Sequence, residues 1–226
     1  MPEHDQSLDA LRRRLAADVA PVRPLRPARW LAAALAVFAL AGVTYFGAYY
    51  ALGFRADRPA LGPFGFWGLS ALQMAVALAL LGLALRESVP GRRPSLALLW
   101  TGVGVGLVAH IGIFAATYRL SPVETPMKAD VGGLALYCFL YEMKLGLPVL
   151  VLALWLASRG LATRPTRLAV LVGVGAALAG DALWRLVCPL SDPDHILRAH
   201  TPSLLAAGGV ALLITWGWDR LRLARS

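Results

Sequence analysis

The stretch LYCFLYEMKLGLPVLVLALWLA, residues 136–157, contains only two charged side chains. It reaches the length of ~20 residues that a helix needs to cross the hydrocarbon core of a bilayer. Similar apolar stretches occur at residues 30–51, 66–85, 96–117, 168–187 and 203–217. Backbone polar groups in lipid must be satisfied within the segment, so helices are the expected structure. The sequence therefore predicts an all-α, polytopic membrane protein with six transmembrane helices.

The composition supports this fold class. The chain has 226 residues, of which 58% are hydrophobic and 15% are charged, whereas soluble domains average about half apolar and about a quarter charged. A sequence pI near 10.4 would suggest nucleic acid as the partner of a soluble protein. Here the basic residues are explained by membrane topology, and we expect no direct nucleic-acid binding.

The basic residues are unevenly shared between the two sides of the predicted bundle. The side formed by residues 1–29, 86–95, 158–167 and the C-terminal end carries the whole net charge of +9, and the opposite connections sum to zero. The positive-inside rule makes the basic side cytoplasmic, so both termini are expected in the cytoplasm. The predicted organisation is a cytoplasmic tail (1–29), a six-helix transmembrane domain (30–217) and a cytoplasmic C-terminal end (218–226).

The tail carries a short amphipathic segment. Its apolar residues recur at helical spacing, at Leu8, Leu11, Leu15 and Val19. The following PVRPLRP, residues 21–27, has proline at every third position and favours an extended spacer. The amphipathic segment either lies on anionic lipid or fits the groove of a cytosolic partner. The residues alone leave both interpretations open.

The two cysteines are predicted at the outer ends of the fourth and fifth spans. Cys138 and Cys188 would lie on an oxidising side in a bacterium, where thiols can form a disulfide. A disulfide requires Cα atoms within ~7 Å, which the sequence does not establish. The alternative is a pair of buried, inert thiols.

Charged residues inside the outer halves of these spans favour a site. Glu142 lies one helical turn beyond Cys138, and Asp181 and Arg185 are spaced to pair along one helix. Ionisable groups within a membrane helix usually face the bundle interior. With Lys144, they predict a polar cluster that supports sensor cysteines. If the fourth span begins later than residue 136, Glu142 and Lys144 are merely interfacial.

Metal and enzyme chemistry are weakly indicated. The loop 188–202 groups several metal-ligating residue types, namely Cys188, Asp192, Asp194, His195 and His200. Their spacing matches no closed structural zinc pattern, so no metal site or cofactor is predicted. His110 is interpreted as a hydrogen-bonded core histidine. No GxSxG, HExxH or P-loop pattern occurs, and we do not expect an enzyme.

Several motifs together resemble one family. They are LDALRRRLAADVAPVRPLRPARW at 8–30, ESVPGRRPS at 87–95, LPVLVLALWLASRGLATRP at 147–165 and CPLSDPDHILRAH at 188–200. In this order, with six spans, they resemble the NrsF-type (negative regulator of sigma F) membrane anti-sigma factors. The resemblance extends over nearly the whole chain.

The resemblance implies a function that composition does not. Such proteins hold an extracytoplasmic-function sigma factor at the bacterial inner membrane and release it under stress. Cys138 and Cys188 would correspond to the family's paired periplasmic cysteines, which are implicated in sensing redox or metal stress. The sigma factor would contact the tail at Leu8, Leu11, Leu15, Val19, Pro21, Val22, Arg23, Pro24, Leu25 and Pro27.

The main alternative is a small membrane transporter or metal-handling protein that uses the outer polar cluster. Deleting residues 1–28 distinguishes the two functions. An anti-sigma factor would lose its regulation, whereas a transporter would keep its activity.

Overall fold

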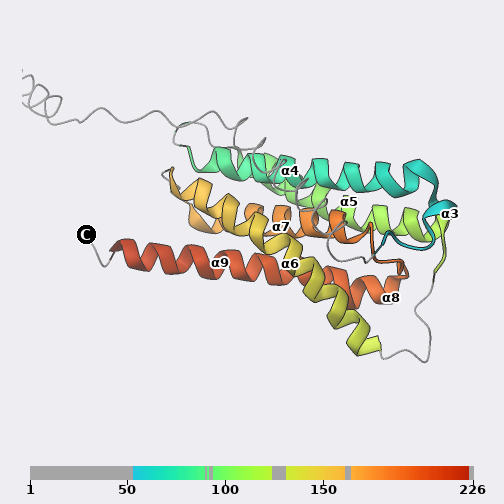
Figure 1. Cartoon of the computed structure of the whole chain (residues 1–226). Coiled ribbons are helices and arrows are strands. Elements are labelled where there is room, and N and C mark those ends of the chain that lie inside the picture. The colour runs from blue at the N-terminus through green and yellow to red at the C-terminus, as the bar shows by residue number, and fades with distance from the viewer. Residues whose placement is uncertain (1–52, 90, 92–93, 124–130, 161–163, 224–226) are drawn as a thin grey trace, which may run out of the picture.

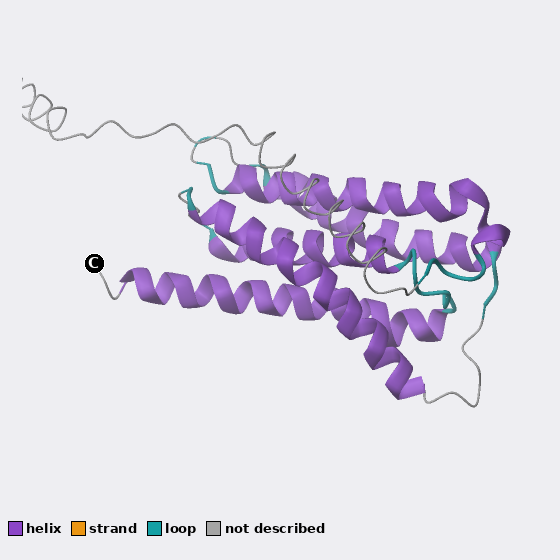
Figure 2. Cartoon of the chain, viewed as in Figure 1, coloured by secondary structure: helices purple, strands orange, loops and turns teal. Residues whose placement is uncertain are grey.

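The computed structural model describes residues 53–89, 91, 94–123, 131–160 and 164–223. They form α3 (Arg58–Pro63), η1 (Phe64–Gly68), α4 (Leu69–Glu87), α5 (Leu96–Leu120), α6 (Val131–Ser158), α7 (Pro165–Trp184), α8 (Pro193–His195), η2 (Ile196–His200) and α9 (Thr201–Leu223). The described residues contain no strand (Figure 2), which agrees with the predicted all-α class. The tail and the predicted span at 30–51 lie outside the described residues.

Five helices in the described part of the chain are long and apolar enough to cross a membrane. Several boundaries differ from the predicted ones, because a helix continues after its hydrophobic segment ends. The second runs from Arg58 to Glu87, and the sixth predicted span becomes a continuous helical run from Pro193. The helix α6 begins at Val131, five residues before the predicted start. Glu142 therefore lies well inside the helix, and its side chain is buried in the bundle.

Helix α7 is the centre of the described bundle and contacts α4, α5, α6 and α9 (Figure 1). Its small residues allow these neighbours to approach closely. A Cβ added at Gly173 would lie 2.6 Å from the Cα of Gly208 on α9, and one at Gly180 would lie 2.7 Å from the carbonyl oxygen of Glu142 on α6. Glycines of α7 thus allow the backbones of α6 and α9 to pack closely against it.

The bundle has two ends of different character. We call "basic end" the one where α4 and α6 finish and α5 and α7 begin, next to the basic connections 86–95 and 158–167. We call "thiol end" the opposite one, where α7 finishes and α6 begins near the cysteines (Figure 1). The two basic connections 86–95 and 158–167 therefore join helices at the same end of the bundle, as the charge pattern predicts.

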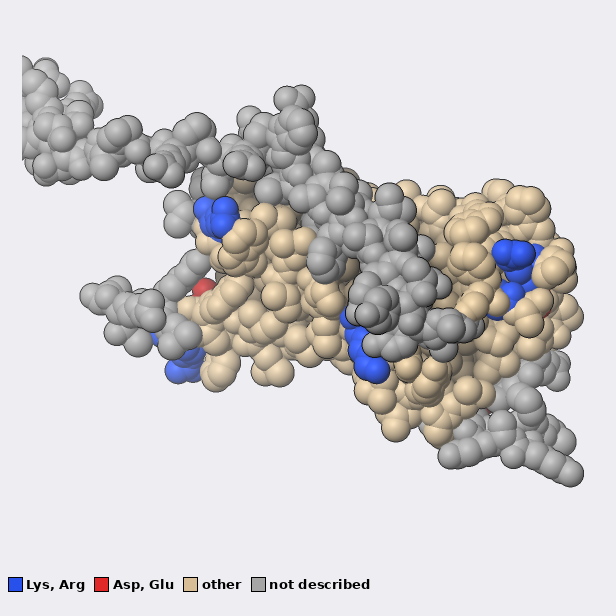
Figure 3. Space-filling model, in the orientation of Figure 1, with Lys and Arg blue, Asp and Glu red and all other residues tan. Residues whose placement is uncertain are grey.

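The outer surface of the described bundle is largely apolar. Val108 is 72% exposed and Leu205 is 76% exposed, and the face shown in Figure 3 has only small groups of charged atoms on its described part. Contiguous exposed apolar surface of this kind marks a membrane or partner contact. The surface supports a bundle that is embedded in lipid.

Candidate functional site

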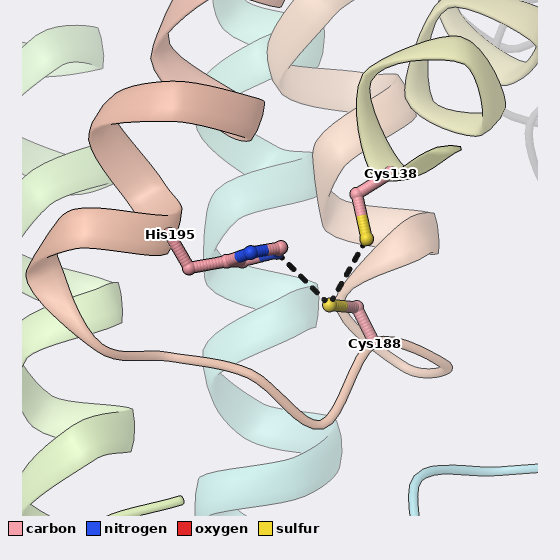
Figure 4. A group of neighbouring side chains, drawn as sticks. All are labelled: Cys138, Cys188 and His195. Atoms are coloured by element: carbon pink, nitrogen blue, oxygen red, sulfur yellow. Dashed lines mark hydrogen bonds between the residues drawn. The ribbon is translucent and has the colours of Figure 1, made fainter. Parts of the chain in front are cut away.

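The two cysteines meet at the thiol end. Cys138 lies on α6 and Cys188 follows the end of α7, and their Sγ atoms are 3.6 Å apart. The Nε2 atom of His195 lies 3.6 Å from the Sγ of Cys188 (Figure 4). All three side chains are buried. We call Cys138, Cys188 and His195 the thiol tier.

Local capping positions the histidine of this tier. Asp192 is the N-cap of α8, and its Oδ1 accepts a hydrogen bond from the backbone N–H of His195 at 3.0 Å. Pro193 occupies the first helical position, where its missing N–H costs nothing. The backbone N–H of Cys188 donates to the carbonyl of Trp184 at 2.9 Å. The sequence CPLSDPDH therefore folds its first and last residues toward each other.

The surroundings of Cys188 disfavour its thiolate form. The contact with Cys138, followed by burial, raises the pKa of the Cys188 thiol well above its ordinary value. The thiolate is the reactive form of cysteine. Cys188 therefore needs a base, a metal ion or a local opening before it reacts.

A second group lies next to the thiol tier. The Nδ1 of His200 donates to Oδ1 of Asp181 at 2.7 Å and lies 3.4 Å from Oε2 of Glu142. All three side chains are buried. We call Glu142, Asp181 and His200 the carboxylate tier.

Every long helix in the described part of the chain contributes a side chain to the hydrogen-bond network of the carboxylate tier. Oδ2 of Asp181 on α7 accepts hydrogen bonds from Gln73 on α4 and, at 2.9 Å, from His110 on α5. Oε1 of Glu142 on α6 accepts a hydrogen bond at 2.6 Å from Ser203 on α9. A change in this tier therefore reaches all five helices. His110 is a hydrogen-bonded core histidine, as predicted.

The two tiers are adjacent. Cys138 and Glu142 are one turn apart on α6, and the rings of His195 and His200 make an edge contact with centroids 5.3 Å apart. Both histidines belong to the helical run that contains η2, a π-helix of residues Ile196–His200. Short π-helical segments occur frequently at functional sites.

The sequence of the chain matches a known protein family. The family described as "NrsF: Negative regulator of sigma F" matches residues 15–219. The chain belongs to the NrsF family. It is a negative regulator of a sigma factor, which is therefore its partner. Searches of curated proteins and of solved structures found no match.

The match to the NrsF family confirms the resemblance seen in the motifs. It includes Leu15 and the PVRPLRP segment of the tail, and it begins after Leu8 and Leu11. These predicted sigma-binding residues all lie outside the described part of the structure, so their role stays a prediction.

The sequence spaces Asp181 and Arg185 to pair along one helix, but the hydrogen bonds of the Arg185 guanidinium go to other groups. The helix α7 ends at Trp184, and the Arg185 side chain turns to η1. Its guanidinium donates to the carbonyls of Gly65 (2.6 Å) and Phe66 (3.2 Å). It also donates to hydroxyls of α4 and α5, namely Ser70 (2.7 Å) and Thr117 (2.7 Å). Arg185 thus fastens the end of α7 to η1.

A second arginine secures the loop that carries Cys188. Arg55 donates to the carbonyl of Pro189 at 2.7 Å and to Oγ of Ser191 at 3.1 Å, and it pairs with Asp57 at 2.6 Å. Burial opposes ionisation of Asp57, but hydrogen bonds from Arg55 and Ser121 outweigh it and hold the pKa of Asp57 below its ordinary value. This cation was not singled out from the sequence, because it lies in a short connection.

Lys144 does not belong to the polar cluster. Its side chain is exposed, and its Nζ lies 4.4 Å from the centre of the Tyr141 ring. Residues i and i+2 of a helix point to different faces. Since Glu142 points into the bundle, Lys144 points away from it.

The loop residues considered as a metal group are separated by the fold. Cys188 and His195 join the thiol tier, His200 joins the carboxylate tier, and Asp192 caps α8. Asp194 is exposed and pairs with Arg198. Sequence reasoning missed Gln73 and Ser203 as members of the network. The signal for Gln73 was a strongly polar residue within the apolar span 66–85.

Proposed function

We propose that this protein holds an extracytoplasmic-function sigma factor at the bacterial inner membrane and releases it when Cys138 and Cys188 react. Residues 1–29 form the sigma-binding segment, and the thiol end faces the periplasm. The NrsF match supports a negative regulator of a sigma factor. The sigma-factor class, the sensing chemistry and the orientation are the proposed part.

The observation that carries the sensor is the sulfur contact of 3.6 Å. The two cysteines come from separate helices, 50 residues apart in sequence. Oxidation would remove one hydrogen from each thiol, transfer two electrons to an external oxidant and form a sulfur–sulfur bond. Alternatively, a soft metal ion would displace the thiol protons and bind both sulfurs. Either reaction fixes α6 to the end of α7.

The energies are of a useful size for a switch. A disulfide contributes ~2–4 kcal/mol, while moving an equilibrium from 1:99 to 99:1 needs ~5.5 kcal/mol. One covalent bond therefore shifts sigma-factor release substantially without making it all-or-none. The positive-inside rule supports the orientation: the Lys/Arg-rich connections of the basic end favour the cytoplasm, and the thiol end is on the opposite side of the bundle.

A reporter gene driven by the cognate sigma factor tests the sensor. Wild-type cells should activate the reporter after diamide or Cd²⁺, whereas Cys138→Ser, Cys188→Ser and the double variant should stay repressed. Lys144→Ala, on the same helix but exposed, is the matched control and should respond like wild type. Normal release from the double variant under every stress would rule out the thiol switch.

A transporter or metal-handling protein is the second candidate. It is favoured by the buried carboxylates and histidines of the carboxylate tier, because such groups within a membrane bundle often mark ion pathways. Deleting residues 1–28 should abolish sigma-factor repression if the anti-sigma proposal is right. A deletion that leaves repression intact would favour the second candidate.

A further inference from the structure

We propose that the carboxylate tier is a site for one divalent metal ion of borderline hardness, such as Zn²⁺, inside the bundle and distinct from the thiol tier. Glu142, Asp181 and His200 are its ligands. This site goes beyond the thiol sensor and does not depend on it.

The ligand atoms already converge. The Oε2 of Glu142, the Oδ1 of Asp181 and the Nδ1 of His200 come from three helical elements, and each residue of the group offers a ligand atom within 4.8 Å of the others. Tetrahedral Zn²⁺ with bonds of ~2.0–2.2 Å places its ligand atoms roughly 3.3 Å apart. The Nδ1 of His200 lies 2.7 Å from one of these oxygens and 3.4 Å from the other. Small side-chain shifts would therefore admit the ion.

An unpartnered oxygen points independently to a ligand. Glu142 is only 1% exposed, and its Oε2 receives no hydrogen bond from the described residues. A buried carboxylate oxygen that receives no hydrogen bond is costly, because it has lost the hydrogen bonds that water would give it. This oxygen faces the Nδ1 of His200 at 3.4 Å. A metal ion between them would supply the missing interaction.

The second oxygen of each carboxylate accepts hydrogen bonds from neighbouring side chains. Oδ2 of Asp181 accepts from Gln73 and His110, and Oε1 of Glu142 accepts from Ser203. Such outer hydrogen bonds are the usual way in which proteins orient metal-binding carboxylates. One oxygen of each carboxylate is thus fixed, while the other is directed toward His200.

The ligand chemistry selects the metal. Two carboxylates and one imidazole suit borderline ions such as Zn²⁺, whereas Mg²⁺ and Ca²⁺ prefer all-oxygen sites and soft ions prefer the sulfurs of the thiol tier. A divalent ion balances the charges of Glu142 and Asp181, which reduces the cost of burying them. Binding through Nδ1 requires its proton to leave that nitrogen: in a neutral imidazole it moves to Nε2, and an imidazolium releases one proton to solvent.

The test uses purified full-length protein in nanodiscs without any sigma factor, and Zn²⁺ as the probe. The Cys138→Ser/Cys188→Ser variant should bind one Zn²⁺, with only nitrogen and oxygen neighbours in its X-ray absorption spectrum. Adding Glu142→Gln should weaken binding by more than ~100-fold, because second-layer changes alone cost ~10–100-fold. Adding Lys144→Ala should change nothing. Thermal unfolding of each variant shows whether it is folded.

A second variant protects the test against misfolding. Ser203→Ala keeps all three ligands and should weaken Zn²⁺ binding by ~10–100-fold. The proposal is overturned if the cysteine-free protein binds no Zn²⁺, if sulfur alone binds it, or if Glu142→Gln and Ser203→Ala bind as tightly as their parent. Because no sigma factor is present, these results are independent of the reporter experiment.

Discussion

The basic end and the thiol end of the bundle are both well packed, but by different kinds of side chain. Near the basic end the core is mainly leucine and alanine, with Leu81, Leu150 and Leu171 fully buried. At the thiol end Arg185, Asp181 and His200 are equally buried, and each is held by hydrogen bonds. Apolar packing tolerates volume-conserving changes, whereas a buried polar network fails when one partner is lost. The thiol end is therefore expected to be more sensitive to the loss of a single side chain than the basic end.

Breaking the Arg185 network should have the largest effect. Arg185→Met should lower the free energy of unfolding by roughly 3–5 kcal/mol, since several buried acceptors each lose a charged donor. The measurement is denaturant unfolding in detergent micelles. Arg198→Met is the control, because Arg198 and its partner Asp194 are exposed and such pairs contribute at most about 1 kcal/mol. Equal effects of the two substitutions would contradict the assigned role of Arg185.

Helix packing between α7 and α9 should give the next largest effect. Gly173→Ala should destabilise the protein by about 1–3 kcal/mol, because its Cβ would meet the backbone of α9 at 2.6 Å. The opposing change, Gly208→Ala, places its Cβ in open space and should be neutral or stabilising by up to about 1 kcal/mol. The same unfolding assay compares them, and a reversed order would refute this packing.

Substituting the two N-caps, Ser95 at the basic end and Asp192 at the thiol end, should have the smallest effect on stability. The two substitutions should differ most clearly in their effect on the reactivity of Cys188. Ser95 accepts from the backbone N–H of Leu98 at 3.1 Å, as Asp192 does from His195. Each change to alanine should cost about 1 kcal/mol. Only Asp192→Ala should alter the rate at which Cys188 is alkylated, because it displaces His195. Identical alkylation rates in both variants would exclude this positioning role.

Much of the scaffold was predictable, because hydropathy and length determine which segments can cross a membrane. The boundaries were less predictable, since the helices continue beyond the apolar stretches of the sequence. The span containing Cys138 thus began at Val131. The error with Lys144 was avoidable, because helical geometry already separates it from Glu142.

The grouping of the site was not predictable from local sequence. His110 and Gln73 precede Asp181 by 71 and 108 residues in the sequence. No rule of local spacing predicts that such distant residues form hydrogen bonds with each other. The binding of Arg185 to the carbonyls of η1 likewise depends on where α7 ends and on how η1 packs against that end. Such contacts arise only from tertiary packing.

The most direct test joins thiol chemistry to partner release in one sample. Full-length protein in nanodiscs, loaded with its sigma factor, is titrated with diamide while mass spectrometry follows the Cys138–Cys188 disulfide and a pull-down follows bound sigma factor. The account predicts an intramolecular disulfide, the loss of two hydrogens, and release of the sigma factor over the same range of oxidant. Complete disulfide formation with the sigma factor still bound would contradict it.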